Sequence, residues 1–261
     1  MQRTAKTSGR GHLRRRNRLA LLGTAAAVTL GTGLAVSDHD EATARTEDVI
    51  VGQGADHLPN RTASDWVTYA DHVLVVSATS EKEIAPTQQE VERGEGTVGR
   101  TVTLTVDKML WSRPDAPRPA PDTWEYSAMG WQFQDGDTGN RTKMALIDQP
   151  RVEPGHRYVT AVRWEETACS PGDAPEPAQW RGLGEGSEVP FDAGVIGQGE
   201  LEGHSRTAAQ ARSAKLEAGD DAGLEDQLAG RGEDALVQEL NAAHPHEPET
   251  FGPARPRDIC A

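Results

Sequence analysis

The chain has 261 residues, and its 41 Asp and Glu outnumber its 27 Lys and Arg, which gives a formal net charge of −14. Seven basic residues precede position 37 with no acid among them, so positions 37–261 carry 20 basic and 41 acidic residues, a charge of −21. A chain this acidic is a poor candidate for nucleic-acid binding, because neutralising phosphates requires clustered Lys and Arg. Its two cysteines are too few for a disulfide scaffold or a zinc ribbon.

The N-terminus has the layout of an export signal. Residues 19–36 form an uncharged run of 18 residues, preceded by four arginines within residues 14–18 and followed by acids from Asp38 onward. The basic flank predicts that residues 1–18 stay in the cytoplasm and that the rest of the chain is exported. At about 1.5 Å per residue the run would extend roughly 27 Å, close to the ~30 Å hydrocarbon core of a bilayer.

Two fates of this run stay open. If it is retained, it is a transmembrane helix, and the protein is anchored in the cell membrane by a single pass with its C-terminal domain outside the cell. If signal peptidase cleaves at Ala42-Thr43-Ala44, which has the small-x-small pattern, the protein is secreted.

A β domain is predicted after a polar linker at residues 37–64. All six Trp and all three Tyr lie between Trp66 and Trp180, so the core is expected within residues 65–200. Ser64 and Asp65 predict a short helix start just before Trp66. In residues 100–111, apolar residues alternate with threonines, the pattern of a strand with one buried and one polar face. A sheet with one polar face is typically antiparallel.

Further strands are predicted at residues 72–78, 123–134, around 144–147, and at 157–164, 188–191 and 195–197. The expected fold class is therefore mainly β, a small antiparallel barrel or sandwich of six to seven strands. Residues 201–261 are predicted to form a partly helical tail, with helices near residues 206–217 and 232–243. In the second, Leu236, Val237 and Leu240 make an apolar stripe, which favours docking on the β domain over a solvated tail.

The two cysteines, Cys169 and Cys260, are predicted to form a disulfide, because the compartment outside the cytoplasm is oxidising. The bond would close a loop of about 90 residues and stabilise the fold by roughly 4–5 kcal/mol in the chain-entropy model. Two unpaired thiols are the alternative. Neither cysteine has the Cys-His surroundings of a catalytic thiol.

The sequence contains no Gly-x-Ser-x-Gly, His-Glu-x-x-His or Walker pattern. The glycines at 182, 184 and 186 are predicted to form turns, because Glu185 between them would repel a phosphate. Two loops offer hard oxygen ligands for calcium: Asp135, Asp137 and Asn140, and Glu185, Glu188 and Asp192. Since the first departs from the EF-hand pattern, turn chemistry is the preferred interpretation, and no metal site or cofactor is assigned.

Trp111, Trp124 and Trp131 are candidates for an exposed binding platform, because indole faces stack on sugar rings. Burial is the competing interpretation and the favoured one. A domain this poor in aliphatic side chains needs Trp to fill its core.

Several stretches carry a resemblance to a known group of proteins. They are Leu110-Trp111-Ser112-Arg113-Pro114, Gly130-Trp131, Pro154-Gly155-His156-Arg157-Tyr158-Val159 and the glycine-rich residues 183–200. Through them, residues 66–245 resemble uncharacterised exported proteins of high-GC Gram-positive bacteria, which implies export and architecture but no activity. The order Ala70-Asp71-His72-Val73, an alternating strand and a Gly-x-x-Tyr-Val strand is also similar to netrin-type small β-barrels, although those carry cysteines near their start that this chain lacks.

The leading functional hypothesis is a membrane-tethered or secreted cell-envelope protein without catalytic activity, whose β domain binds an envelope protein or a glycan. One alternative is an acid-dependent hydrolase that uses a carboxylate pair such as Glu185 and Asp192. The other is a calcium-stabilised structural domain.

Overall fold

The computed structural model describes residues 48–169, 175–218 and 222–249. Strands hold 43% of them and helices 23%, so the predicted mainly β class is confirmed. The predicted cytoplasmic segment (1–18) and export helix (19–36) lie outside the described residues. Within the described ranges, no helix is both long enough and apolar enough to span a bilayer.

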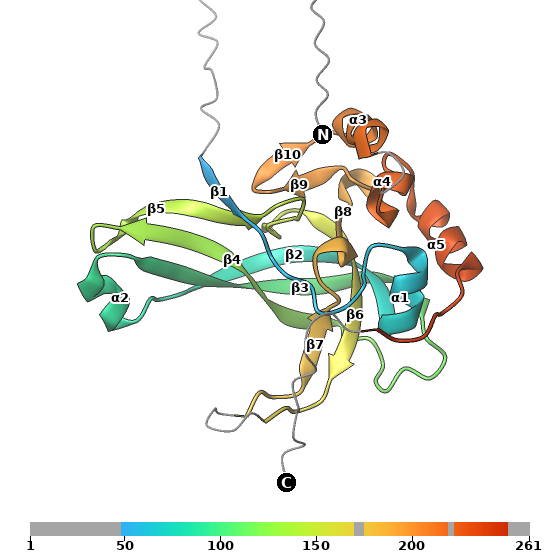
Figure 1. The fold of residues 1–261 in the computed structure, drawn as a ribbon, viewed down its shortest axis with the longest axis horizontal. Coiled ribbons are helices and arrows are strands. Elements are labelled where there is room, and N and C mark those ends of the chain that lie inside the picture. Colours follow the sequence, from blue (N-terminus) through green and yellow to red (C-terminus); the bar gives the residue numbers. More distant parts are fainter. Residues whose placement is uncertain (1–47, 170–174, 219–221, 250–261) are drawn as a thin grey trace, which may run out of the picture. The chain divides into compact units, whose positions relative to one another are not determined.

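One sheet of eight strands organises the described domain, in the order β1-β5-β4-β3-β2-β6-β7, with β8 also paired to β6 (Figure 1). A separate two-stranded sheet joins β9 to β10. The strands are β1 (Val49–Gly52), β2 (His72–Ile84), β3 (Gly96–Ser112), β4 (Thr123–Gln134), β5 (Asp137–Leu146), β6 (Arg157–Glu165), β7 (Gln179–Gly182), β8 (Glu188–Pro190), β9 (Gly199–Leu201) and β10 (His204–Arg206). The helices are α1 (Ala63–Tyr69), α2 (Gln88–Arg93), α3 (Ala208–Ala218), α4 (Leu224–Leu228) and α5 (Glu233–Ala242), with short 3-10 turns η1 (Glu185–Ser187) and η2 (Asp192–Gly194).

The sheet is mixed and open, which corrects the prediction of an antiparallel barrel or sandwich of six to seven strands. β1 runs parallel to β5, with Val49 opposite Lys143, while the neighbouring pairs β4–β5 and β3–β4 are antiparallel. The described strand path runs from β1 to β7 without returning, so no barrel closes. β1 also lies in the range predicted to be a linker, where three consecutive apolar residues were the only pattern.

β2 and β3 form the long antiparallel pair at the centre of the sheet, connected by α2. In β3, Val102 and Leu104 are buried while Thr103 between them is half-buried, as the alternating sequence predicts. β2 extends beyond the predicted end at Ala78 as far as Ile84, through residues that are exposed. This extension was not predictable from apolar pattern, because backbone pairing with β3 holds it instead of burial.

Helices α1, α4 and α5 cover one face of the sheet centre (Figure 1). Trp66 of α1, Leu228 of α4 and Leu240 of α5 share a buried cluster with Val73 of β2 and Val159 of β6. The predicted docking of the second tail helix, which is α5, is therefore confirmed, and α3 confirms the first. The strand predicted at residues 195–197 is wrong, because a turn occupies these residues and β9 begins two residues later.

A second buried cluster lies on the opposite face. Leu74 and Val76 belong to it, whereas Val73 and Val75 belong to the helix-covered cluster, as expected because successive side chains of a strand point to opposite faces. Tyr158 of β6 completes its centre. The sheet therefore has an apolar layer on both faces at β2, as expected for a central strand.

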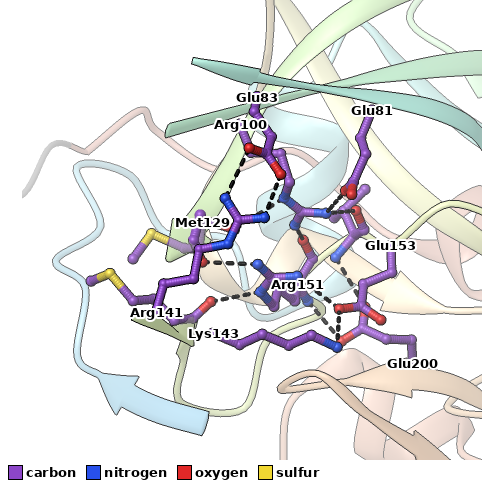
Figure 2. A network of polar contacts seen from close by, with 12 residues as sticks. Glu81, Glu83, Arg100, Met129, Arg141, Lys143, Arg151, Glu153 and Glu200 are labelled. Carbon is purple, nitrogen blue, oxygen red and sulfur yellow. Dashed lines mark hydrogen bonds and ion pairs between the residues drawn. The ribbon is translucent and has the colours of Figure 1, made fainter. Parts of the chain in front are cut away.

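Two buried arginines tie the chain between β5 and β6 to the sheet (Figure 2). Arg151, which is 2% exposed, donates from Nε to the Met144 carbonyl at 2.9 Å and from Nη2 to the Gly130 carbonyl at 2.8 Å. Arg100, which is 1% exposed, donates from Nη1 to the Val152 carbonyl at 3.2 Å. Their ion-pair partners are Glu153 for Arg151, at 2.7 Å, and Glu81 for Arg100, at 2.8 Å.

Glu200 is the acceptor at the other end of this buried network. Its Oε1 accepts from the backbone N–H groups of Arg151 at 3.0 Å and Gly203 at 2.7 Å. Its Oε2 accepts from the Val152 N–H and the Tyr158 hydroxyl, both at 2.9 Å. Val152 has a φ of 59°, which is rare for a β-branched residue, and these bonds hold it there.

The last described residues run along α1. His246 donates its backbone N–H to the Thr68 hydroxyl at 3.0 Å, and its Nε2 lies 3.0 Å from Oδ1 of Asp65. Its ring meets that of Tyr69 edge-on at 5.6 Å between centroids, and the Tyr69 hydroxyl donates to the Glu249 carbonyl at 3.0 Å. Part of the predicted tail is therefore docked through polar contacts.

We expect this docking to weaken as the pH rises through the pKa of His246. The Glu247 carbonyl and then the Asp65 carboxylate raise that pKa above the usual 6.5. A histidine whose pKa is raised in the folded state stabilises that state fully at any pH below its pKa in the unfolded chain. This contribution is lost as the pH rises through its pKa in the folded state. Native-state hydrogen exchange, corrected for intrinsic rates, should show that the backbone amides of residues 246–249 become less protected as the pH rises. H246Q should abolish the pH dependence, and H244Q should leave it unchanged; equal protection at pH 6 and pH 8.5 would contradict the prediction.

Candidate functional site

A glycine-rich loop, residues 182–187, joins β7 through η1 to β8. The buried Ser187 closes this loop on itself. Its Oγ accepts from the backbone N–H groups of Leu183 and Gly184, both at 3.1 Å, and donates to the Gly184 carbonyl at 2.7 Å. The predicted turn chemistry of these glycines is confirmed by η1 and by this bonding.

The glycines also let the segment after β1 approach closely. Asp56 accepts from the Glu185 N–H at 2.9 Å, and the buried Asn60 accepts from the Gly186 N–H at 3.1 Å. A Cβ at Gly186 would lie 2.7 Å from Oδ1 of Asn60, and one at Gly184 would collide with the Asp56 carboxylate. Gly184 has φ 128° and ψ −163°, a conformation open in practice only to glycine.

A cavity of about 500 Å³, called the acidic cavity below, lies on one side of this loop. Carboxylates and two arginines dominate its wall. The carboxylates are Asp56, Asp148, Glu185, Glu217, Glu225 and Asp226, and the arginines are Arg61 and Arg206. These side chains come from the segment before α1, the turn after β5, η1, β10, α3 and α4, so the cavity depends on elements that are far apart in the chain.

The acidic cavity has a surplus of negative charge. Arg206 is already engaged, because it forms an ion pair with Glu225 and donates from Nε to the Gly197 carbonyl at 2.7 Å. Burial raises the pKa of Glu225 to about 7, although Arg206 opposes this. As far as the structure is described, Oε1 of Glu185 is buried and has no hydrogen-bond partner.

A smaller cavity of about 240 Å³, called the aromatic cavity below, also borders the glycine-rich loop. Residues of β4 and β7 form its wall together with the loop. They are Glu125, Tyr126 and Ser127, then Gln179, Trp180, Arg181 and Gly182, then Gly184 and Glu188. The Trp180 ring is positioned by Trp164 and His72, whose ring centroids lie 5.4 and 5.3 Å from its own.

Glu188 is the buried acid of the aromatic cavity, with 8% of its surface exposed. Its Oε2 accepts from the Tyr126 hydroxyl at 2.7 Å, and its Oε1 faces Gly182, where a Cβ would lie 2.8 Å away. Burial raises the pKa of Glu188 to about 7, the Tyr126 bond lowers it, and the charges of Asp56 and Glu200 add to the increase. Both protonation states are therefore populated near neutral pH.

Curvature of the sheet brings Tyr126 and Glu188 together. Tyr126 lies on β4 and Glu188 on β8, which pairs with β6, and β3 and β2 stand between β4 and β6 in the strand order. Tyr126 and Trp180 both pack against the cluster centred on Leu74 and Val76. The sequence named Glu188 only as a calcium ligand and gave no sign of its partner Tyr126, since no local pattern shows which strands face each other.

The three tryptophans proposed as a platform lie in three different clusters. Trp111 packs against the helix-covered cluster, Trp124 against the one on the opposite face, and Trp131 belongs to a third. Trp131 is 8% exposed, and the guanidinium carbons of Arg141 and Arg151 lie 4.2 and 4.8 Å from its ring centroid. Their separation favours the burial interpretation over a common sugar-binding surface.

The predicted carboxylate pair is divided between two environments. Glu185 lines the acidic cavity, whereas Asp192 accepts from Nδ1 of His156 at 2.6 Å and from the Arg157 N–H at 2.8 Å. Asp192 lines neither of the cavities found in the described domain. The two carboxylates do not share a cleft, so this geometry does not support the hydrolase hypothesis.

The loop of Asp135, Asp137 and Asn140 lies where β4 turns into β5, and Oδ1 of Asp137 accepts from the Gly139 N–H at 2.8 Å. Counting only described residues, no three His, Cys, Asp or Glu side chains are placed to hold a metal ion. Of the two cysteines, Cys169 is described and Cys260 lies outside the described residues, so the disulfide between them stays a prediction.

The two cavities share one chemistry, because each presents a buried or partly buried carboxyl group in a negatively charged wall. Such walls suit cationic groups, while a phosphate would be repelled. No protein-family model, curated protein or solved structure matches the chain.

Proposed function

We propose that this chain is an exported cell-envelope protein, membrane-tethered or secreted, whose domain is a non-catalytic module that binds a basic partner in the acidic cavity. The observation that carries the proposal is a cavity of about 500 Å³ lined by six carboxylates and two arginines. Its volume falls within the range of about 300–1,000 Å³ that is usual for ligand sites.

Charge supports a basic partner over a neutral glycan. Six carboxylates line the cavity against two arginines, so the acidic side chains outnumber the basic ones around it. The exported part of the chain carries a charge of −21, so its field also attracts cations from a distance. A Lys- or Arg-rich segment of another envelope protein fits both properties.

Titration of the full chain with a tetralysine peptide, followed by calorimetry, tests the proposal. The double variant D148N/E217Q removes two exposed cavity carboxylates and should weaken binding about fivefold or more. The matched control is E92Q/D115N, which makes the same change of net charge at exposed positions outside the cavity and should stay within about twofold. Absence of binding, or equal weakening in both variants, would refute the cavity as the binding site.

The export part of the proposal rests on the charge and length of residues 1–36. Fractionation of the native host, with N-terminal sequencing of the recovered protein, distinguishes a membrane-anchored protein from a secreted one. An intact N-terminus in the membrane fraction indicates an anchor, and a new N-terminus near residue 45 in the medium indicates secretion. Recovery of the intact chain from the cytoplasm would contradict export.

A further inference from the structure

Glu188 is a buried acid without a basic partner. Only 8% of its surface is exposed, and its one side-chain hydrogen bond among the described residues comes from the neutral Tyr126 hydroxyl. None of the ion pairs formed within the described ranges includes it. A buried carboxylate without a counter-charge is costly, so structures usually pair such a group.

The space beside Glu188 is shaped for a small group. Glu188, Gly182, Tyr126 and Trp180 are all among the residues that line the aromatic cavity of about 240 Å³. Because Gly182 has no side chain, Oε1 of Glu188 is not covered from that direction. Aromatic rings around a carboxylate are the usual surroundings of a bound ammonium group, which gains both an ion pair and cation–π attraction.

We propose that the aromatic cavity is a second binding site, which takes a single ammonium group and uses Glu188 as its counter-charge. Trp180 and Tyr126 supply the aromatic wall. The ammonium group completes an ion pair that the described chain leaves incomplete. This site is separate from the acidic cavity, since Glu188, Tyr126 and Trp180 line only the aromatic one.

The charged surroundings of Glu188 favour a cation and make binding depend on pH. The groups that act on it are Tyr126 from β4, Asp56 from the segment before α1 and Glu200 from β9, and the exposed Glu125 and Arg181 also line the cavity. Arg181 is engaged by Glu165, at 2.8 Å. Since the pKa of Glu188 is about 7, its ionised fraction falls from about nine-tenths at pH 8 to about one-tenth at pH 6. The apparent affinity for an ammonium ion should therefore fall roughly tenfold.

The test follows the indole N–H resonance of Trp180 in the full chain by NMR, assigned with a W180F variant. n-Butylammonium is the probe, and n-butanol is its neutral match. We expect butylammonium to shift the resonance saturably at pH 8, with affinity about tenfold lower at pH 6, and butanol to bind at least tenfold more weakly. Nα-acetyl-lysine amide carries the same ammonium group on a peptide side chain; its binding assigns a protein side chain as the source, and binding of butylammonium alone assigns a free amine.

Variants separate this site from its surroundings. E188Q keeps an acceptor for Tyr126 but removes the charge, and should lower the affinity for butylammonium at least tenfold at pH 8. Y126F keeps the ring and removes the hydrogen bond that lowers the pKa of Glu188, so the midpoint of the pH dependence should move upward. E92Q, a control at an exposed position outside both cavities, should change the affinity by no more than about twofold.

Equal binding of butanol, a wild-type affinity independent of pH, or unchanged binding by E188Q would each overturn the proposal. The wild-type pH series decides the matter even if E188Q does not fold. If the ammonium site proves wrong, the proposal that tetralysine binds in the acidic cavity still stands, because D148N and E217Q test that cavity alone. Conversely, loss of tetralysine binding has no bearing on the Trp180 resonance.

Discussion

Replacing Glu200 with Gln should lower the free energy of unfolding by about 3–5 kcal/mol. Each carboxylate oxygen accepts at least one backbone N–H, Oε1 from Arg151 and Gly203 and Oε2 from Val152. Whichever way the Gln amide turns, its NH₂ therefore faces a backbone donor. If the NH₂ takes the position of Oε2, Val152 also loses the bond that holds its positive φ. Thermal and chemical unfolding of E200Q measure the effect, with an expected fall in Tm of roughly 10 °C.

Glu166 provides the matched control for this change. It accepts from the Trp164 indole N–H at 2.8 Å, but it is exposed, so E166Q should cost no more than about 1 kcal/mol. The difference between the two variants isolates burial and the number of donors, because the substitution is the same. If E200Q and E166Q unfold alike, the network shown in Figure 2 does not hold the domain together in the way described.

Replacing Gly184 with Ala should cost about 3 kcal/mol or more. The residue has φ 128°, and its added Cβ would collide with the Asp56 carboxylate and the Asn60 amide. Those two side chains hold the segment before α1 on the glycine-rich loop, so both cavities should be distorted. Chemical unfolding measures the loss of stability, and both ligand titrations should weaken.

Gly155 is the control for backbone conformation alone. Its φ is 93°, yet no atom outside its immediate chain neighbours lies within 4 Å of an added Cβ. G155A therefore carries the strain of a positive φ without a collision and should cost about 1 kcal/mol. Similar losses for G155A and G184A would mean that the close approach of Asp56 and Asn60 adds nothing to stability.

The sequence predicted those elements whose buried side chains follow a regular pattern within a short segment. The alternation around Val102 and Leu104 predicted a central part of β3, the residues of β4 were predicted as a strand, and the stripe of Leu236 and Leu240 predicted a docked helix. Each of these elements places its apolar side chains at a regular period along one segment. Such a pattern is readable without knowing any partner strand.

The prediction was wrong or incomplete where the structure of a segment depends on a distant part of the chain. The four residues of β1 become a strand because β5 offers an edge in parallel orientation, and a distant edge leaves no mark on so short a segment. The site was missed for the same reason. Glu188 and its partner Tyr126 are separated by 62 positions, and only the bending of the sheet places the phenol against the carboxylate.

The position of β1 also limits how far a tethered domain could reach. Only residues 37–47 separate the end of the apolar run from the first described residue, just before β1. Fully extended at about 3.6 Å per residue, such a stretch spans at most roughly 40 Å. An anchored protein would therefore search only a shallow layer next to the bilayer, and a partner held in that layer would meet it at a high effective concentration even if each contact were weak.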